Sequence, residues 1–182
     1  MTHNVVTLKN SELLTLTYGS LVTQLLKDFE DVKRVNTELE KMGYKMGQRL
    51  IEEYMAKSNP SAGGCTEFHE TAEAIAKVAF KMFLNITANV VQWNSEQTSY
   101  VLQFNENPLN DFVELPDHMR QSGEGGLWYC NLLAGVIRGA LEMVQMKVTC
   151  EFVKCPLKGD DVSEIRVTLR EYLKEVVPVD DD

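Results

Sequence analysis

The chain has 182 residues, 44% hydrophobic and 25% charged, a balance typical of one globular domain with a sizeable core. Its 27 Asp and Glu residues outnumber 18 Lys and Arg residues, so the net charge of −9 argues against nucleic acid as a partner. No apolar run approaches the roughly 20 residues of a membrane span, and the N-terminus lacks a signal-peptide pattern. We therefore expect a cytoplasmic single-domain protein over residues 1–182, with flexible ends at 1–9 and 178–182.

Three amphipathic helices are predicted in the first half of the chain. Apolar residues recur at helical spacing over 14–29 and 35–54, and again over 68–83 after a loop at 59–64. In the third helix, Glu73 and Lys77 are placed to form an i,i+4 ion pair on the solvent side. Its wide apolar face consists of Phe68, Ala72, Ile75, Ala76, Ala79, Phe80 and Phe83.

The second half of the chain alternates between strand and helix. Residues 90–93 and 100–104 read as one hairpin, and residues 148–153 and 165–170 as another. Between them, residues 127–144 form a helix that is apolar over most of its circumference, so it must be central. Its Gly135 and Gly139, four residues apart, allow another backbone to come close. Hairpins imply an antiparallel sheet, and segregated helices and hairpins imply an α+β fold.

Cys65 is the most informative single residue. It follows Gly63 and Gly64 at the start of the third helix, where the free N–H groups and the helix dipole favour a thiolate. A nucleophilic thiol beside a long apolar surface suits attachment of a lipid chain. Two alternatives stay open: a loop cysteine without a role, and a Cys65–His69 pair of the Cys–His protease kind, for which the sequence shows neither an orienting group nor an oxyanion hole.

The remaining candidates have simpler interpretations. Cys150 and Cys155 lack the short pair spacing of zinc sites, so we expect no metal, and Cys130 and Cys150 read as small buried hydrophobes. No standard catalytic signature is present. Arg34, Lys41 and Lys45 share a helix face, which is either simply solvated or a patch for anionic lipid.

Several ordered blocks of the sequence are characteristic of one family. The blocks lie within residues 14–25, 47–52, 70–82, 107–116 and 131–146, and include Asp111-Phe112-Val113-Glu114-Leu115-Pro116 and Arg138-Gly139-Ala140-Leu141-Glu142-Met143-Val144-Gln145-Met146. Over nearly its whole length, the chain resembles the Bet-three family, a core small subunit of the transport protein particle (TRAPP) tethering complex.

The resemblance implies a structure and a bound lipid. The implied fold is α+β, with helices packed on a twisted antiparallel sheet of about four strands and an interior hydrophobic channel. It also implies a palmitoyl chain, thioester-linked to Cys65 and held inside that channel. Ile75, Ala79 and Phe80 carry over as channel-lining residues, and Ala79 is small where a larger side chain would plug the channel. Such a buried lipid would act as core and not as a membrane anchor.

The resemblance also implies a function. The chain would be a core subunit of a vesicle-tethering complex in endoplasmic reticulum to Golgi transport, peripheral at cis-Golgi and endoplasmic reticulum membranes. Its partners would be other TRAPP small subunits and, through the assembled exchange factor, a Rab GTPase of the early secretory pathway, with a homodimer left open. No catalysis is expected from the isolated chain. Two further hypotheses are a reversible lipid or small-molecule binding protein using the channel, and a thiol enzyme that passes on its acyl group.

Overall fold

The computed structural model describes residues 2–58, 67–121 and 125–173, with side chains from residue 12 onward. Helices α1 (Thr2–Asp28) and α2 (Val32–Lys57) come first. A third helical run follows, composed of α3 (Phe68–Glu73), a π-helical turn η1 (Ala74–Ala79) and α4 (Phe80–Leu84). Helix α1 begins at Thr2, within the segment expected to be loose, so the backbone there is helical and the expected flexibility of 1–9 stays a prediction.

The second half forms the sheet and one inserted helix. Strands β1 (Asn89–Val91) and β2 (Ser99–Phe104) precede α5 (Asn131–Met143), and β3 (Met146–Lys154) and β4 (Ser163–Tyr172) follow it. Short 3-10 turns occur at Pro108–Asn110 (η2), Asp117–Met119 (η3) and Pro156–Lys158 (η4). The four strands pair antiparallel in the order β1-β2-β4-β3. The predicted α+β fold is therefore confirmed.

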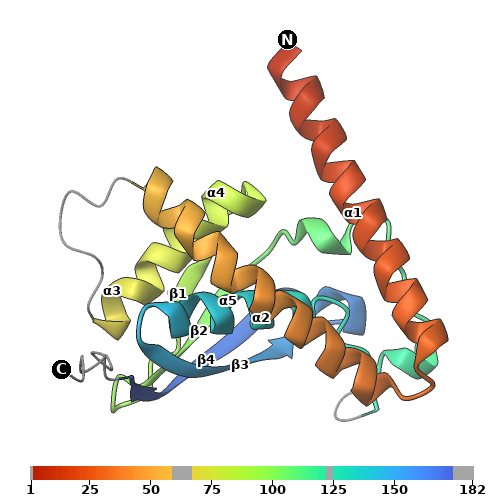
Figure 1. The fold of residues 1–182 in the computed structure, drawn as a ribbon. Coiled ribbons are helices and arrows are strands. Elements are labelled where there is room, and N and C mark those ends of the chain that lie inside the picture. The colour runs from red at the N-terminus through yellow and green to blue at the C-terminus, as the bar shows by residue number, and fades with distance from the viewer. Residues whose placement is uncertain (1, 59–66, 122–124, 174–182) are drawn as a thin grey trace, which may run out of the picture.

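The core lies between the sheet and the helices, which Figure 1 shows stacked over one face of it. Tyr100, Leu102 and Phe104 share one face of β2 and are almost fully buried, and Val101 between them is buried as well. The ring of Phe104 meets Phe80 of α4 edge-on, with centroids 5.2 Å apart. Helix α5 contacts β3 on one side and α2 on the other, so it is the central helix that its apolar circumference required.

Helices α2 and α5 are packed backbone to backbone through four glycines. A Cβ atom on Gly43 would lie 1.9 Å from the carbonyl oxygen of Leu132, and one on Gly47 would lie 2.1 Å from that of Val136. Reciprocally, a Cβ on Gly135 or Gly139 would lie 2.0 or 2.1 Å from the carbonyl oxygen of Glu40 or Tyr44. The sequence pattern predicts the close approach at α5, but it does not predict that Gly43 and Gly47 form the matching pair on α2. The pairing of positions shows that the two helices run parallel.

The third helical run differs from the prediction in two ways. It is interrupted by η1, where the Phe80 N–H donates to the Ile75 carbonyl, five residues back. Lys77 does not pair with Glu73 in the described part of the chain. Its ammonium donates instead to the Ala88 carbonyl at 2.8 Å and to Asn89 Oδ1 at 3.0 Å. These acceptors at the entry to β1 are fixed by the fold, whereas an exposed i,i+4 partner contributes only about 0.5 kcal/mol.

Candidate functional site

An apolar cavity of about 710 Å³ lies among α1, α2, the third helical run and α5. Its wall is almost entirely hydrocarbon, with Thr17, Tyr18, Tyr54, Ser58 and Thr71 as the polar residues. Helix α5 contributes one face of its apolar surface. These α5 residues are Leu132, Leu133, Val136, Ile137, Ala140 and Leu141. A cavity of this size and character fits a hydrophobic ligand.

The predicted lining residues Ile75, Ala79 and Phe80 all face this cavity. Phe80 is buried and also contacts the sheet, whereas Ile75 and Ala79 are only partly buried because they border empty space. Cys65 lies outside the described residues. The segment that contains it joins Ser58 to Glu67, and both Ser58 and Thr71 belong to the cavity wall. In the sequence, Cys65 therefore lies between two residues of the cavity wall.

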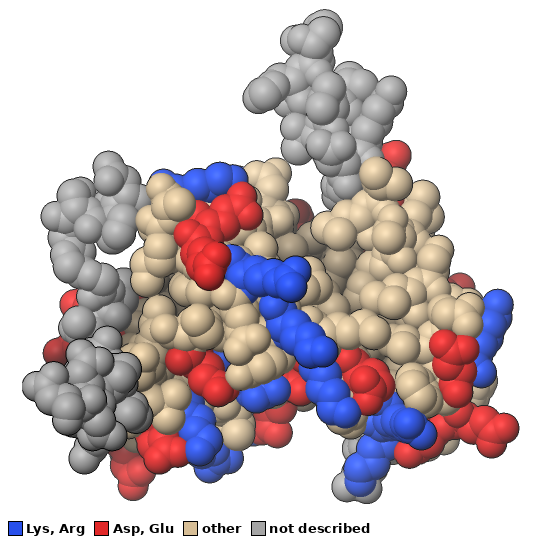
Figure 2. Space-filling view, in the orientation of Figure 1, with Lys and Arg blue, Asp and Glu red and all other residues tan. Residues whose placement is uncertain are grey.

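The cavity is not enclosed on every side. Leu14, Met46, Met55 and Val78 line it and still keep between 38% and 48% of their surface exposed. Figure 2 shows uncharged surface on the α1 side of the hollow, whereas charged side chains gather over α2 on its other side. The structure therefore shows an apolar cleft, and the closed interior channel stays a prediction.

Sequence reasoning missed the contributions of α1 and α2 to the cavity. Leu14 and Leu21 of α1 and Met46, Leu50 and Tyr54 of α2 all line it. Each had been assigned to an amphipathic stripe, so the apolar face was visible in the sequence. Periodicity shows that a face is apolar but not whether it meets another side chain or a void.

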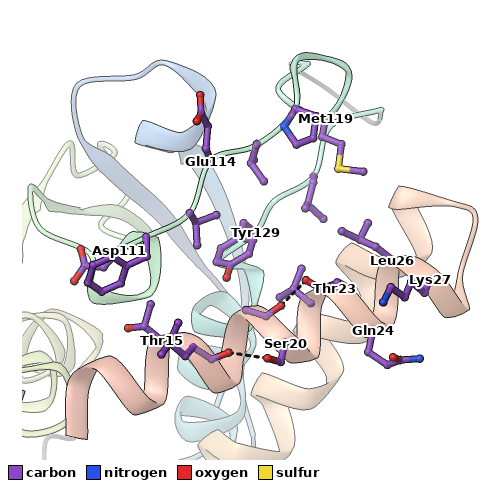
Figure 3. Close-up of a pocket in the computed structure, with 18 residues that line it drawn as sticks. Thr15, Ser20, Thr23, Gln24, Leu26, Lys27, Asp111, Glu114, Met119 and Tyr129 are labelled. Atoms are coloured by element: carbon purple, nitrogen blue, oxygen red, sulfur yellow. Dashed lines mark hydrogen bonds between the residues drawn. The ribbon is translucent and has the colours of Figure 1, made fainter. Parts of the chain in front are cut away.

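A second groove of similar volume separates α1 from the segment around Asp111–Met119 (Figure 3). Thr15, Ser20 and Thr23 line its α1 side, and Ser20 and Thr23 donate to carbonyls of their own helix, at Leu16 and Gly19. Tyr129 points its hydroxyl toward α1, and among the described residues that buried hydroxyl has no hydrogen-bond partner. On the opposite wall, Phe112 is 78% exposed with a left-handed φ of 62°. A bulky residue rarely adopts that conformation, so Phe112 is an unusual residue of this wall.

Known proteins match this chain along most of its length. A family model for the "Transport protein particle (TRAPP) component" matches residues 14–168. The chain belongs to the TRAPP component family. The resemblance stated from the sequence is thereby confirmed.

Three similar proteins of the TRAPP family are described as subunit 3 or bet3 of the particle. "Trafficking protein particle complex subunit 3" of Dictyostelium discoideum is 57% identical over 170 residues, covering 93% of this chain and 88% of that protein. "Transport protein particle subunit bet3" of Schizosaccharomyces pombe is 49% identical over 95% of this chain and 91% of that protein. Among solved structures, a trafficking protein particle complex subunit 3 from Naegleria fowleri superposes with a TM-score of 0.87 and 66% identity. It covers 91% of this chain and 98% of its own, and is described as covalently bound to palmitic acid.

Three cysteines of this TRAPP chain are described, and all three are free thiols. Cys130 and Cys155 are buried, and Cys130 donates a hydrogen bond to Asn110 Oδ1 at 2.8 Å. Desolvation raises the pKa of the Cys130, Cys150 and Cys155 thiols. Within the described ranges, no three His, Cys, Asp or Glu side chains cluster as metal ligands would. These thiols behave as small apolar side chains.

The raised thiol pKa values predict a loss of stability in alkali. The unfolded chain releases these protons near the ordinary thiol pKa of about 8.5, whereas the folded chain retains them. The thiols' contribution is therefore complete below that pKa and lost as the pH rises above it. We compare Cys65→Ala with Cys65→Ala that also carries Cys150→Val. Between pH 8.5 and 9.5, the free energy of unfolding should fall less steeply with pH in the double variant, by up to about 1.4 kcal/mol per pH unit. Urea titrations across pH 7–9.5 measure this, and identical slopes in the two proteins would contradict it.

The basic face of α2 is already partly occupied by intramolecular contacts. The Arg34 guanidinium lies 4.4 Å from the centroid of the Phe29 ring, and Lys41 pairs with Glu38 at 2.9 Å. Both contacts fit the simpler interpretation of a solvated helix face, and the anionic-lipid patch stays a prediction. Among the helices that the structure describes, none is both long and apolar enough to cross a bilayer.

Proposed function

We propose that this chain is a core subunit of a TRAPP vesicle-tethering complex and that it carries a palmitoyl chain as a thioester on Cys65, seated in the apolar cavity. The cavity carries the proposal, because Ile75, Ala79 and Phe80 line it and its wall begins beside the segment that contains Cys65. The Naegleria fowleri relative, 66% identical, is bound covalently to palmitic acid, which supplies the ligand chemistry.

Intact-mass measurement of the native purified chain tests the lipid. We expect an added mass of one palmitoyl group that neutral hydroxylamine removes, because hydroxylamine cleaves thioesters. Cys65→Ala should lack the added mass, and Cys150→Ala should keep it as a matched control. An unmodified wild-type mass would refute the covalent part of the proposal and leave the family membership untouched.

The wider role follows from family membership. In this proposal the chain assembles with other TRAPP small subunits, and the composite surface acts on a Rab GTPase in transport from the endoplasmic reticulum to the Golgi. The chain works from the cytoplasm, as a peripheral component of those membranes, and contributes no catalysis on its own. Reconstitution tests this role: nucleotide exchange should require the assembled subunits and be absent from the isolated chain.

Exposed apolar residues around the second groove are the favoured surface for subunit assembly. Leu16 on α1 is 61% exposed and Phe112 opposite it is 78% exposed, and both line the groove. Aromatic residues such as Phe112 are enriched at interfaces, and a few well-packed side chains carry most of the binding energy of an interface.

Replacing both groove residues with charge should weaken assembly. We expect Leu16→Asp with Phe112→Asp to raise the dissociation constant for other small subunits at least about 30-fold, since each lost anchor costs about 1–2 kcal/mol. Pull-down followed by analytical ultracentrifugation measures it. Met143→Asp, which alters an exposed residue of α5 outside both cavities, is the control. Unchanged assembly of the double variant would place the interface elsewhere. Ultracentrifugation of the isolated chain would also show whether it self-associates.

The exposed rim of the cavity favours one alternative, a protein that binds a lipid or another apolar small molecule reversibly. In that case a ligand would exchange freely and bind equally well to the Cys65→Ala chain. Retention of a native ligand by Cys65→Ala after purification would favour this alternative over the thioester. A thiol enzyme would instead transfer the acyl group to an added acceptor over many turnovers.

A further inference from the structure

The third helical run keeps three straight stripes of side chains along its whole length. Along each of these three stripes, residues four apart have similar environments. The buried stripe is Phe68, Ala72, Ala76 and Phe80, of which Phe80 also borders the cavity. The cavity stripe is Thr71, Ile75, Ala79 and Phe83, and Ala74, Val78 and Leu84 widen the cavity wall beside it. The exposed stripe is Glu73, Lys77 and Lys81.

A continuous α-helix would not keep these stripes straight. With 3.6 residues per turn, each step of four residues advances by about 40°, so Phe83 would be rotated about 120° away from Thr71. The π-helical turn η1 accommodates one extra residue, which sets the rotation back by roughly 100°. Because of η1, Ala79 and Phe83 face the same cavity as Thr71 and Ile75.

The π-helical turn is held from outside the helix. Since the Phe80 N–H bonds to the Ile75 carbonyl, the Ala76 carbonyl loses its usual donor in the helix. The Ala88 N–H replaces that donor at 2.9 Å. Lys77 then fixes the same segment, donating to the Ala88 carbonyl and to Asn89 Oδ1.

We propose that Lys77 is a positioning residue for the lipid site: by clamping Ala88 and Asn89 against η1, it preserves the π-helical turn that turns Ala79 and Phe83 toward the cavity. This inference rests on the proposed acyl-binding function and adds a specificity to it. The far part of an acyl chain contacts the wall that η1 aligns, so the clamp determines how long a chain the cavity accepts.

The expected signature is a change in chain-length preference. If the clamp is lost and the run relaxes to an α-helix, Phe83 rotates away from the cavity and the far methylene groups lose their apolar wall. Each buried methylene is worth about 0.8 kcal/mol, so a 16-carbon chain should bind roughly 200-fold more tightly than a 12-carbon chain when the wall is intact. Without the clamp we expect that ratio to fall to about 10-fold or less.

The experiment uses the full chain with Cys65→Ala, so that binding is reversible. Binding of dodecanoic and hexadecanoic acid is measured by their displacement of a fluorescent fatty acid. Lys77→Met removes the ammonium donor and keeps an aliphatic side chain. Lys81→Met is the matched control on the same stripe, because the Lys81 ammonium lies 3.4 Å from the Asn85 carbonyl oxygen. A ratio lost in Lys77→Met and kept in Lys81→Met supports the inference. Faster hydrogen exchange at the Ala88 amide in Lys77→Met would accompany it.

Equal weakening of both acids in Lys77→Met, with the ratio unchanged, would overturn the inference and leave Lys77 as a general stabiliser. If the Cys65→Ala chain itself binds neither acid, the acyl-binding function fails and the inference falls with it. If Lys77→Met does not fold, Asn89→Ala removes one of the two acceptors, and we expect an intermediate ratio. An unchanged ratio in Asn89→Ala would then refute the proposal.

Discussion

Gly135→Ala is expected to lower the free energy of unfolding by at least about 3 kcal/mol, a large cost for a single methyl group. The added Cβ would lie 2.0 Å from the Glu40 carbonyl oxygen and 2.8 Å from the Tyr44 nitrogen. Both are backbone atoms of α2, so no side-chain rotation can make room. The two helices would have to separate, which would loosen the packing at the neighbouring Gly43 as well. Urea denaturation of the deacylated chain measures the change.

Gly19→Ala is the matched control for that prediction. Gly19 also lies inside a helix, but its nearest neighbour would be the Tyr129 hydroxyl at 3.4 Å, an ordinary contact. Alanine is preferred over glycine in a helix by up to about 1 kcal/mol, so this variant should be neutral or stabilised. A Gly135→Ala chain within about 0.5 kcal/mol of wild type would show that α2 and α5 are not in close contact in solution.

The same glycines show which features of the fold can be predicted from the sequence. The i,i+4 pair on α5 predicted a close backbone, because glycine inside a helix is costly unless packing requires it. The partner pair, Gly43 and Gly47, has the same spacing, yet nothing in the sequence says which two helices meet. The period of two predicts that Tyr100, Leu102 and Phe104 share one face of a strand, and all three are buried. It does not predict that Val101 between them is buried too.

The π-helical turn η1 is a feature that the 3.6-residue periodicity of the sequence does not predict. The sequence predicts one wide apolar face of an ordinary helix, made of Phe68, Ala72, Ile75, Ala76, Ala79, Phe80 and Phe83. In the structure Phe68, Ala72 and Ala76 are buried away from the cavity, Ile75, Ala79 and Phe83 line it, and Phe80 does both. The signal was a repeat of four instead of 3.6, but the donor that stabilises it, the Ala88 N–H, is distant in the sequence. Lys77 was misassigned for the same reason, because its acceptors are set by tertiary structure. The identity of the lipid rests on a relative and not on any pattern in this chain.

Removal of the proposed acyl chain should produce the largest change in stability. Burial of a long chain is worth about 0.8 kcal/mol per methylene, an upper bound of roughly 10 kcal/mol, and part of it is lost where the cleft is open to water. We expect hydroxylamine treatment to lower the free energy of unfolding by several kcal/mol in wild type. Cys65→Ala, which has no thioester to cleave, should not respond. An equal response of both chains would mean that the reagent acts elsewhere.

Ala79→Phe separates filling of the cavity from damage to the fold. Because Ala79 borders the empty space, a phenyl ring there occupies the position proposed for the lipid, and acyl occupancy by intact mass should fall about 10-fold or more. In deacylated protein the same ring fills a void, so the free energy of unfolding should be unchanged or rise by about 1 kcal/mol. Glu73→Phe adds the same ring to the exposed stripe of the helix and should remain acylated. Full acylation of Ala79→Phe would mean that the lipid lies elsewhere, whereas loss of both acylation and folding would mean that Ala79 is part of a closed core.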